Sequence, residues 1–247
     1  MSAQPDIRIC EDAAALAQQT TDLFVRLAQE SVAARGRFTV ALAGGSTPKA
    51  AYAMLASTAY RDRVPWQQVH FFWGDERHVP PDHEDSNYHM AYEAMLSKTP
   101  IPAAHIYRIA AEKEAQQAAD DYEATLRTAF QLEPGALPRF DLILLGMGPD
   151  GHTASLFPGT PAVHESQRLV AAPWVEKFNT FRITLTPPVL CNAAYVVFAA
   201  GGADKTETLQ HVLQGPYQPD LYPSQVVRPT QGTLLWLVDK AAARLLS

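Results

Sequence analysis

The sequence predicts an α/β fold, with a mostly parallel central sheet that helices cover on both faces. Short apolar runs rich in Val, Ile, Leu and Phe alternate along the chain with longer segments whose apolar residues recur at helical spacing. The apolar runs show no polar alternation, which is typical of strands buried on both sides. With 247 residues and a hydrophobic content of 47%, residues 1–247 can form a single α/β domain without disulfides.

The first half of the chain alternates between these two patterns. A helix is favoured after the first strand, because Ser and Thr stand at the start of that segment and Pro48 lies in its first turn. Gly36 is a suitable end for the helix that precedes the strand. In chain order we expect a helix over 11–36, a strand over 37–45, a helix over 46–57, a strand over 69–76, a polar loop over 77–87, a helix over 88–96, a short strand over 105–109 and a helix over 112–130.

The second half continues the alternation. Its strands are the most apolar runs of the chain, and Gly215 is a suitable end for one of its helices. We expect strands over 140–146, 169–175, 181–186, 195–202 and 233–239, and helices over 187–193, 204–215 and 239–246.

Four of the expected strands end in polar or glycine-rich segments. In a parallel sheet the carboxyl ends of the strands share one edge, and ligands bind there. These segments should therefore converge on one site; they are 44-GGSTP-48, 74-GDER-77, 147-MGPDGHT-153 and 201-GGADK-205.

The first segment has the composition of a phosphate-binding loop. Gly44 and Gly45 let backbone amides approach a ligand, Ser46 and Thr47 add hydroxyl donors, and the next helix offers free N–H groups at its start. The alternative is an ordinary tight turn with a capping hydroxyl. Two basic residues from other strands are candidates to complete the phosphate clamp, namely Lys205 and Arg182.

The stretch 146-GMGPDG-151 matches the dinucleotide-binding pattern G-x-G-x-x-G but lacks its context. Pro158 leaves room for only one or two helical turns, and no crossover helix leads to an acidic residue about 20 positions on. We instead interpret Asp150 and His152 as a catalytic pair, since glycine between them permits a sharp turn and histidine suits proton transfer near neutrality.

The segment Asp75-Glu76-Arg77 allows two interpretations. It is either an ion pair at the sheet edge or a functional group in which Arg77 polarises a carbonyl and Asp75 holds a hydroxyl or Arg77 itself. Three histidines and three acids in 78-HVPPDHEDSNYH-89 lack a closed metal-ligand spacing, so we expect no metal. A serine nucleophile is disfavoured because the chain has no G-x-S-x-G.

Charge and composition limit the partners. The net charge is −6 with no Lys/Arg run, which argues against nucleic acid and against an anionic membrane surface. Residues 1–10 lack a secretory pattern and no apolar run approaches a membrane span, so we expect a cytoplasmic protein. The two cysteines are far apart and are expected to be reduced thiols; the oligomeric state is open, and a monomer is one option.

Taken together, these segments closely resemble the 6-phosphogluconolactonase family, which belongs to the oxidative pentose phosphate pathway. The resemblance rests on 42-LAGGSTP-48, 71-FFWGDERHVPPDHEDSN-87, 146-GMGPDGHTASLFPG-159, 182-RITLT-186 and 202-GADK-205, with Met147 where glycine is common. It implies a glucosamine-6-phosphate isomerase-like fold, a modified Rossmann-like arrangement, with a sugar-phosphate lactone as substrate and no cofactor. It also implies that His152 is the general base and Arg77 acts on the carbonyl side, while the GGST loop, Arg182 and Lys205 hold the phosphate.

Two alternatives remain at this point. A glucosamine-6-phosphate deaminase of the same superfamily resembles the chain at the phosphate loop and at D-G-H, but it has D-E-Y in place of Asp75-Glu76-Arg77, and a carboxylate where this chain has Phe157. A non-catalytic sugar-phosphate sensor would explain the phosphate loop but not His152 and Arg77 together.

Overall fold

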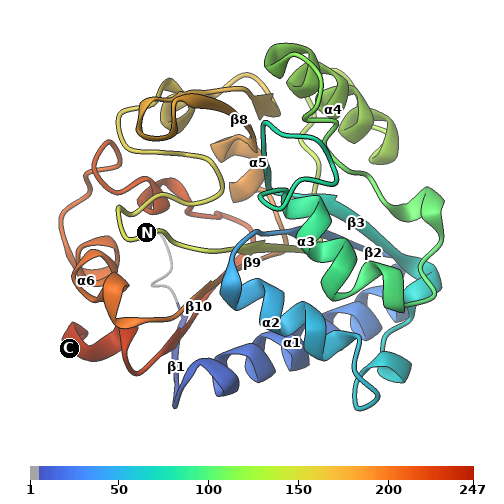
Figure 1. Cartoon of the computed structure of the whole chain (residues 1–247), viewed down its shortest axis with the longest axis horizontal. Helices are drawn as coiled ribbons and strands as arrows, with labels where there is room; N and C mark the ends of the chain where they lie inside the picture. The colour runs from blue at the N-terminus through green and yellow to red at the C-terminus, as the bar shows by residue number, and fades with distance from the viewer. Residues whose placement is uncertain (1–5) are drawn as a thin grey trace.

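The structure is a computed structural model that describes residues 6–247 (Figure 1). Residues 1–5 lie outside the described range. They make up half of residues 1–10, the segment in which the sequence shows no secretory pattern. Six parallel strands form the main sheet in the order β1-β10-β9-β5-β2-β3. Their bounds are β1 Asp6–Cys10, β2 Phe38–Leu42, β3 Val69–Trp73, β5 Leu142–Leu145, β9 Tyr195–Ala200 and β10 Thr233–Asp239. The predicted parallel α/β architecture is confirmed.

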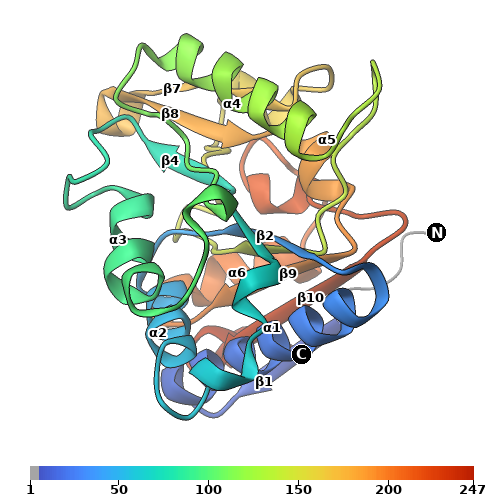
Figure 2. The same ribbon diagram turned by 90° about the vertical axis from the view of Figure 1, so that its right-hand side faces the viewer.

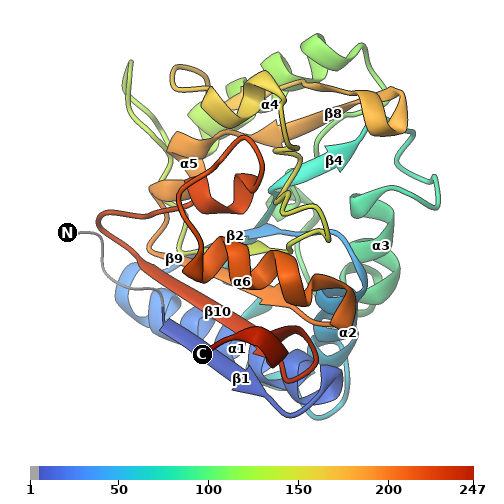
Figure 3. The same ribbon diagram turned by 90° about the vertical axis from the view of Figure 1, so that its left-hand side faces the viewer.

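Helices and a second, smaller sheet enclose the main sheet. Helices α1 and α2 lie on one side, and the second sheet with α4 lies on the other (Figure 2). Helix α6 packs with the C-terminal segment beside β10 (Figure 3). The α-helices are α1 Ala13–Arg35, α2 Ser46–Leu55, α3 Asn87–Ala94, α4 Ala115–Ala129, α5 Pro187–Cys191 and α6 Thr206–Gln214.

The central strands are apolar because both of their faces are covered. Every residue of β2 and β5 is buried. Aromatic rings fill the space between α1 and the sheet: the Phe24 ring meets Phe38 edge-on at 5.3 Å between centroids and stacks on Phe71 at 6.4 Å. Within residues 6–247, no helix is long and apolar enough to cross a membrane.

The second sheet corrects one prediction, because the run expected as one strand over 69–76 divides at Gly74. The Gly74 N–H donates to Leu42 O of the main sheet at 2.9 Å, while its carbonyl accepts from Leu185 N of the second sheet at 2.8 Å. Residues Asp75–Arg77 therefore form β4, which pairs antiparallel with β8, Thr180–Leu185.

The run expected as one strand over 169–175 is also divided. It forms the two short strands β6, Val170–Ala171, and β7, Trp174–Val175, which both pair with β8 rather than with the main sheet. Pro173 lies between them and has no N–H to continue a ladder.

Three further elements differ from the prediction. Segment 105–109 makes only one parallel bridge, from Ile106 to Phe71, and is not a strand. The expected helix over 239–246 is a short 3₁₀ turn, Ala242–Leu245. Strand β1 was not predicted, and it joins the main sheet beside β10.

Candidate active site

A cavity of about 160 Å³ lies at the carboxyl ends of β5, β2 and β3. Five residues predicted from the sequence contribute to its wall. Asp75 and Arg77 come from β4, His152 comes from the loop after β5, and the Gly44-Gly45 backbone comes from the loop after β2. The full lining is Ala43, Gly44, Gly45, Asp75, Arg77, Asn87, Gly146, Met147, Gly148, His152 and Ala154.

Asp150 and His152 form a hydrogen-bonded pair, as the sequence analysis expected of this turn. His152 Nδ1 lies 2.5 Å from Asp150 Oδ1, and Gly151 between them has φ +76°. Burial alone would raise the pKa of Asp150, but hydrogen bonds from His152 and Lys177, together with the charge of the imidazole, hold it well below its usual range. An ionised carboxylate favours hydrogen on Nδ1 and leaves Nε2 as the nitrogen that can accept a proton.

The His152 ring packs closely against Phe157 and Gly148. It stacks on Phe157 with 4.2 Å between ring centroids and an interplanar angle of 24°. It also lies over Gly148, where an added β-carbon would be 2.1 Å from both His152 Cε1 and Nδ1. The second glycine of the G-x-G pattern therefore makes room for the imidazole.

The acidic residues of β4 are buried and hydrogen-bonded. Asp75 Oδ2 accepts from the Ser155 hydroxyl at 2.7 Å, which ties β4 to the loop after β5. Asn87 donates its side-chain amide to Asp75 O at 2.9 Å. The Glu76 carboxylate accepts two backbone N–H groups and one hydroxyl at the start of α3, as well as the N–H of Arg77, so this residue organises the start of the helix.

Arg77 and Arg182 lie directly opposite each other in the antiparallel pair of β4 and β8. Side chains at such positions share one face of a sheet. Burial, and next the positive charge of Arg77, lower the pKa of Arg182. Two guanidinium groups placed side by side create a local attraction for anions in a chain whose net charge is negative. Arg182 itself is not part of the cavity wall.

The GGST loop requires glycine at both of its first positions. Gly45 has φ +100°, which favours glycine, and a β-carbon on Gly44 would be 1.9 Å from Asn87 Oδ1. Ser46 and Thr47 open α2, whose N-terminus has no side-chain cap. Neither residue lines the cavity, although both come directly after Gly45, which does.

Lys205 lies in the 3₁₀ turn Ala203–Lys205 that follows β9, the neighbour of β5 in the sheet, but outside the cavity wall. Its Nζ is 3.0 Å from Asp204 Oδ2, and its side chain is largely covered. The structure thus brings three of the four predicted strand ends to the cavity itself and leaves the fourth beside it.

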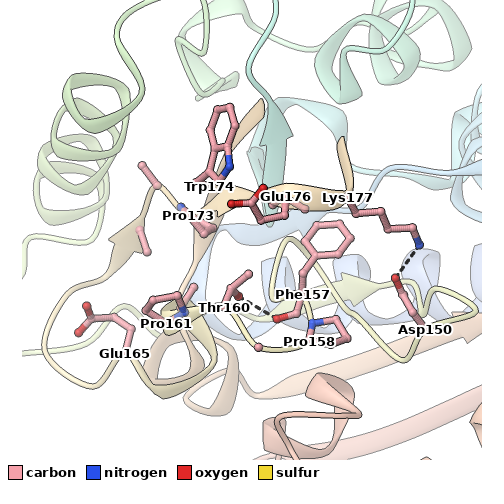
Figure 4. A pocket seen from close by; sticks show the side chains of 15 residues that line it. Asp150, Phe157, Pro158, Thr160, Pro161, Glu165, Pro173, Trp174, Glu176 and Lys177 are labelled. Atoms are coloured by element: carbon pink, nitrogen blue, oxygen red, sulfur yellow. Dashed lines mark hydrogen bonds and ion pairs between the residues drawn. The ribbon is translucent and has the colours of Figure 1, made fainter. Parts of the chain in front are cut away.

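A larger cavity of about 860 Å³ has Asp150 in its wall (Figure 4). Its wall includes Asp150, Phe157 and Trp174. Lys177 also lines this cavity, and at one end of it Lys177 Nζ lies 2.9 Å from Asp150 Oδ2. Sequence reasoning missed Lys177 because no local pattern connects it to a residue 27 positions earlier. It also missed Asn87, for which the only local signal is the Ser-Asn pair that starts α3.

A family model described as "Glucosamine-6-phosphate isomerases/6-phosphogluconolactonase" matches residues 11–236. A 6-phosphogluconolactonase from Synechocystis sp. is 45% identical over 86% of each chain, and one from Nostoc sp. is 42% identical over 98% of each. The solved structure of 6-phosphogluconolactonase from Trypanosoma brucei superposes with a TM-score of 0.88 at 30% identity and covers 100% of both chains.

Proposed function

Because the chain belongs to the glucosamine-6-phosphate isomerase/6-phosphogluconolactonase family, we propose that it hydrolyses 6-phospho-D-glucono-1,5-lactone to 6-phospho-D-gluconate. The observation that carries the proposal is the Asp150–His152 pair, whose imidazole lies in the same cavity wall as Arg77 and the Gly44-Gly45 backbone. This arrangement provides a base, a cation and a site for a phosphate within one small volume.

In the proposed reaction His152 acts as general base. Its Nε2 takes a proton from water while the water oxygen bonds to the lactone C1, and the carbonyl becomes an oxyanion. Arg77 stabilises that charge. When the intermediate collapses, the bond from C1 to the ring oxygen breaks, and the imidazolium returns its proton to the leaving oxygen. Asp150 holds the imidazole throughout, and no acyl-enzyme forms.

Phosphate binding is assigned to the loop before α2 and to two basic residues. Gly44, Gly45, Ser46 and Thr47 provide amides and hydroxyls at the uncapped helix start. Arg182 adds positive charge beside Arg77, and Lys205 exchanges its pairing with Asp204 for the phosphate. An ion pair with the exposed carboxylate of a neighbouring residue is weak, so this exchange costs little.

We also propose that residues 1–247 act as a single catalytic domain, because the residues invoked above come from both sheets of one chain. The cytoplasmic location expected from the sequence stays a prediction.

The test is a coupled assay in which glucose-6-phosphate dehydrogenase generates the lactone and its decay is followed above the spontaneous rate. We expect His152→Ala to lower kcat by roughly 10²–10⁴-fold, the usual contribution of a general base. The same variant should still bind 6-phosphogluconate in calorimetry, because the phosphate loop is on another strand end.

The matched control is His164→Ala, since His164 also pairs with a carboxylate, Asp220, at 2.6 Å but lies exposed and outside the cavity. It should retain wild-type turnover. A His152→Ala protein with wild-type kcat would rule out the general-base assignment.

A further inference from the structure

The turn between β7 and β8, Glu176–Phe178, contacts the proposed catalytic pair from the second sheet. Asp150 uses its two carboxylate oxygens separately, Oδ1 for His152 Nδ1 at 2.5 Å and Oδ2 for Lys177 Nζ at 2.9 Å (Figure 4). Lys177 therefore fixes the rotation of the carboxylate whose other oxygen orients the imidazole.

The next residue of the same turn supports the other side of the site. The Phe178 ring meets Phe157 edge-on, with 5.6 Å between centroids and 75° between planes, and Phe157 stacks on His152. The Arg182 guanidinium lies 5.1 Å from the Phe178 ring centroid. One short turn thus contacts the carboxylate, the ring beneath the imidazole and a predicted phosphate ligand.

We propose that Lys177 is a positioning residue for the lactonase reaction, acting through Asp150 on His152. The inference rests on the proposed function, since it assigns Lys177 a part in that chemistry. Lys177 holds the carboxylate in the rotation that binds Nδ1, and it balances the negative charge of Asp150, so that the pair does not retain a proton on the imidazole.

Lys177 is placed where it contributes little to the stability of the fold. Its side chain is 54% exposed, and an ion pair with such a residue contributes little to folding. A change at Lys177 should therefore leave the protein folded and act on the reaction.

The experiment compares Lys177→Met, which removes the charge and keeps the chain length, with Lys177→Arg, which keeps the charge. The matched control is Lys113→Met, because Lys113 forms a similar surface pair with Asp121 at 2.6 Å and is 50% exposed. We expect Lys177→Met to lower kcat roughly tenfold with KM changed less than twofold, since misplacement of a catalytic group costs mainly turnover. Lys177→Arg should recover most of the loss, and Lys113→Met should match the wild type.

The pH profile separates positioning from packing. Without the cation, protonation of the pair becomes easier, so the acid limb of kcat should move to higher pH in Lys177→Met and return in Lys177→Arg. An unchanged kcat in Lys177→Met, or a lower kcat with an unmoved acid limb, would overturn the inference. The general-base role of His152 is tested separately by His152→Ala.

A measurement without turnover tests the same contact. Nitrogen NMR of the His152 ring should show the Nδ1–H form in the wild type and a mixture of tautomers in Lys177→Met. Identical spectra would contradict the proposal, whatever the activity. A wild-type protein without lactonase activity would refute the proposed function instead, and the NMR result would still decide whether Lys177 orients the pair.

Discussion

Replacing Gly148 with alanine should lower activity without unfolding the protein, because the new β-carbon would collide with the His152 ring. That carbon would be 2.1 Å from Cε1 and Nδ1 of the ring and 2.8 Å from Asp150 Oδ1, whereas ordinary contacts begin near 3.4 Å. Gly148 has no positive φ, so alanine fits its backbone, and its N–H can still donate to His152 O. The imidazole must therefore shift by more than an ångström.

A displacement of this size in a catalytic group costs about 10²-fold in rate, or about 2.7 kcal/mol of transition-state stabilisation. The assay is kcat/KM for Gly148→Ala, His152→Ala and the double variant, with thermal unfolding to confirm the fold. Since the alanine acts through the ring, it should cost nothing more once the ring is gone. A Gly148→Ala enzyme with wild-type kcat/KM, or two effects that multiply in full, would refute this reasoning.

Two further predictions concern charges outside the pair. Lys205→Ala should raise KM for the lactone roughly tenfold with a small change in kcat, as expected for a lost charged contact to phosphate, and an unchanged KM would remove Lys205 from the clamp. Burial, and next the charges of His105 and Arg37, lower the pKa of His70 to about 4. The unfolded chain therefore takes up this proton first, and stability is lost as pH falls from about 6.5 toward 4. The free energy of unfolding should therefore drop less between pH 7 and pH 4.5 in His70→Gln than in the wild type, by about 1 kcal/mol after solvent screening. Urea titrations at the two pH values measure this difference, and equal drops in both proteins would contradict the prediction.

Local patterns predicted the parts of the site that depend on local geometry. The D-G-H turn places two side chains two residues apart, and the glycine between them takes φ +76°, so sequence alone indicated that they could meet. The GGST loop was predictable in the same way, because an apolar strand, two glycines and a helix start follow one another in the sequence. The D-G-H turn and the GGST loop meet because adjacent strands of the parallel sheet end at one edge, and Arg77 comes from β4, which follows β3 after Gly74.

The second sheet could not be predicted in the same way. The run 69-VHFFWGDE-76 is continuous in hydrophobic pattern, yet Gly74 gives its N–H to one sheet and its carbonyl to the other. That division depends on β8, which lies about 110 residues later in the chain. The contact between Lys177 and Asp150 has the same origin, because it depends on where β7 and β8 pack and not on any spacing near either residue.

The residue stacked on the imidazole shows how one fold can serve two reactions. The family that matches this chain includes both isomerases and lactonases, so the fold alone does not choose between them. In this chain the Phe157 ring stacks on His152, where the deaminase resemblance implies a carboxylate, and Asp150 is the carboxylate that His152 contacts. Among residues 6–247, Asp150 is the carboxylate paired with His152, and the Phe157 ring stacks on the imidazole, an arrangement that suits the deprotonation of water rather than sugar ring opening. Phe157 therefore favours lactone hydrolysis at this site for a reason that is independent of overall similarity.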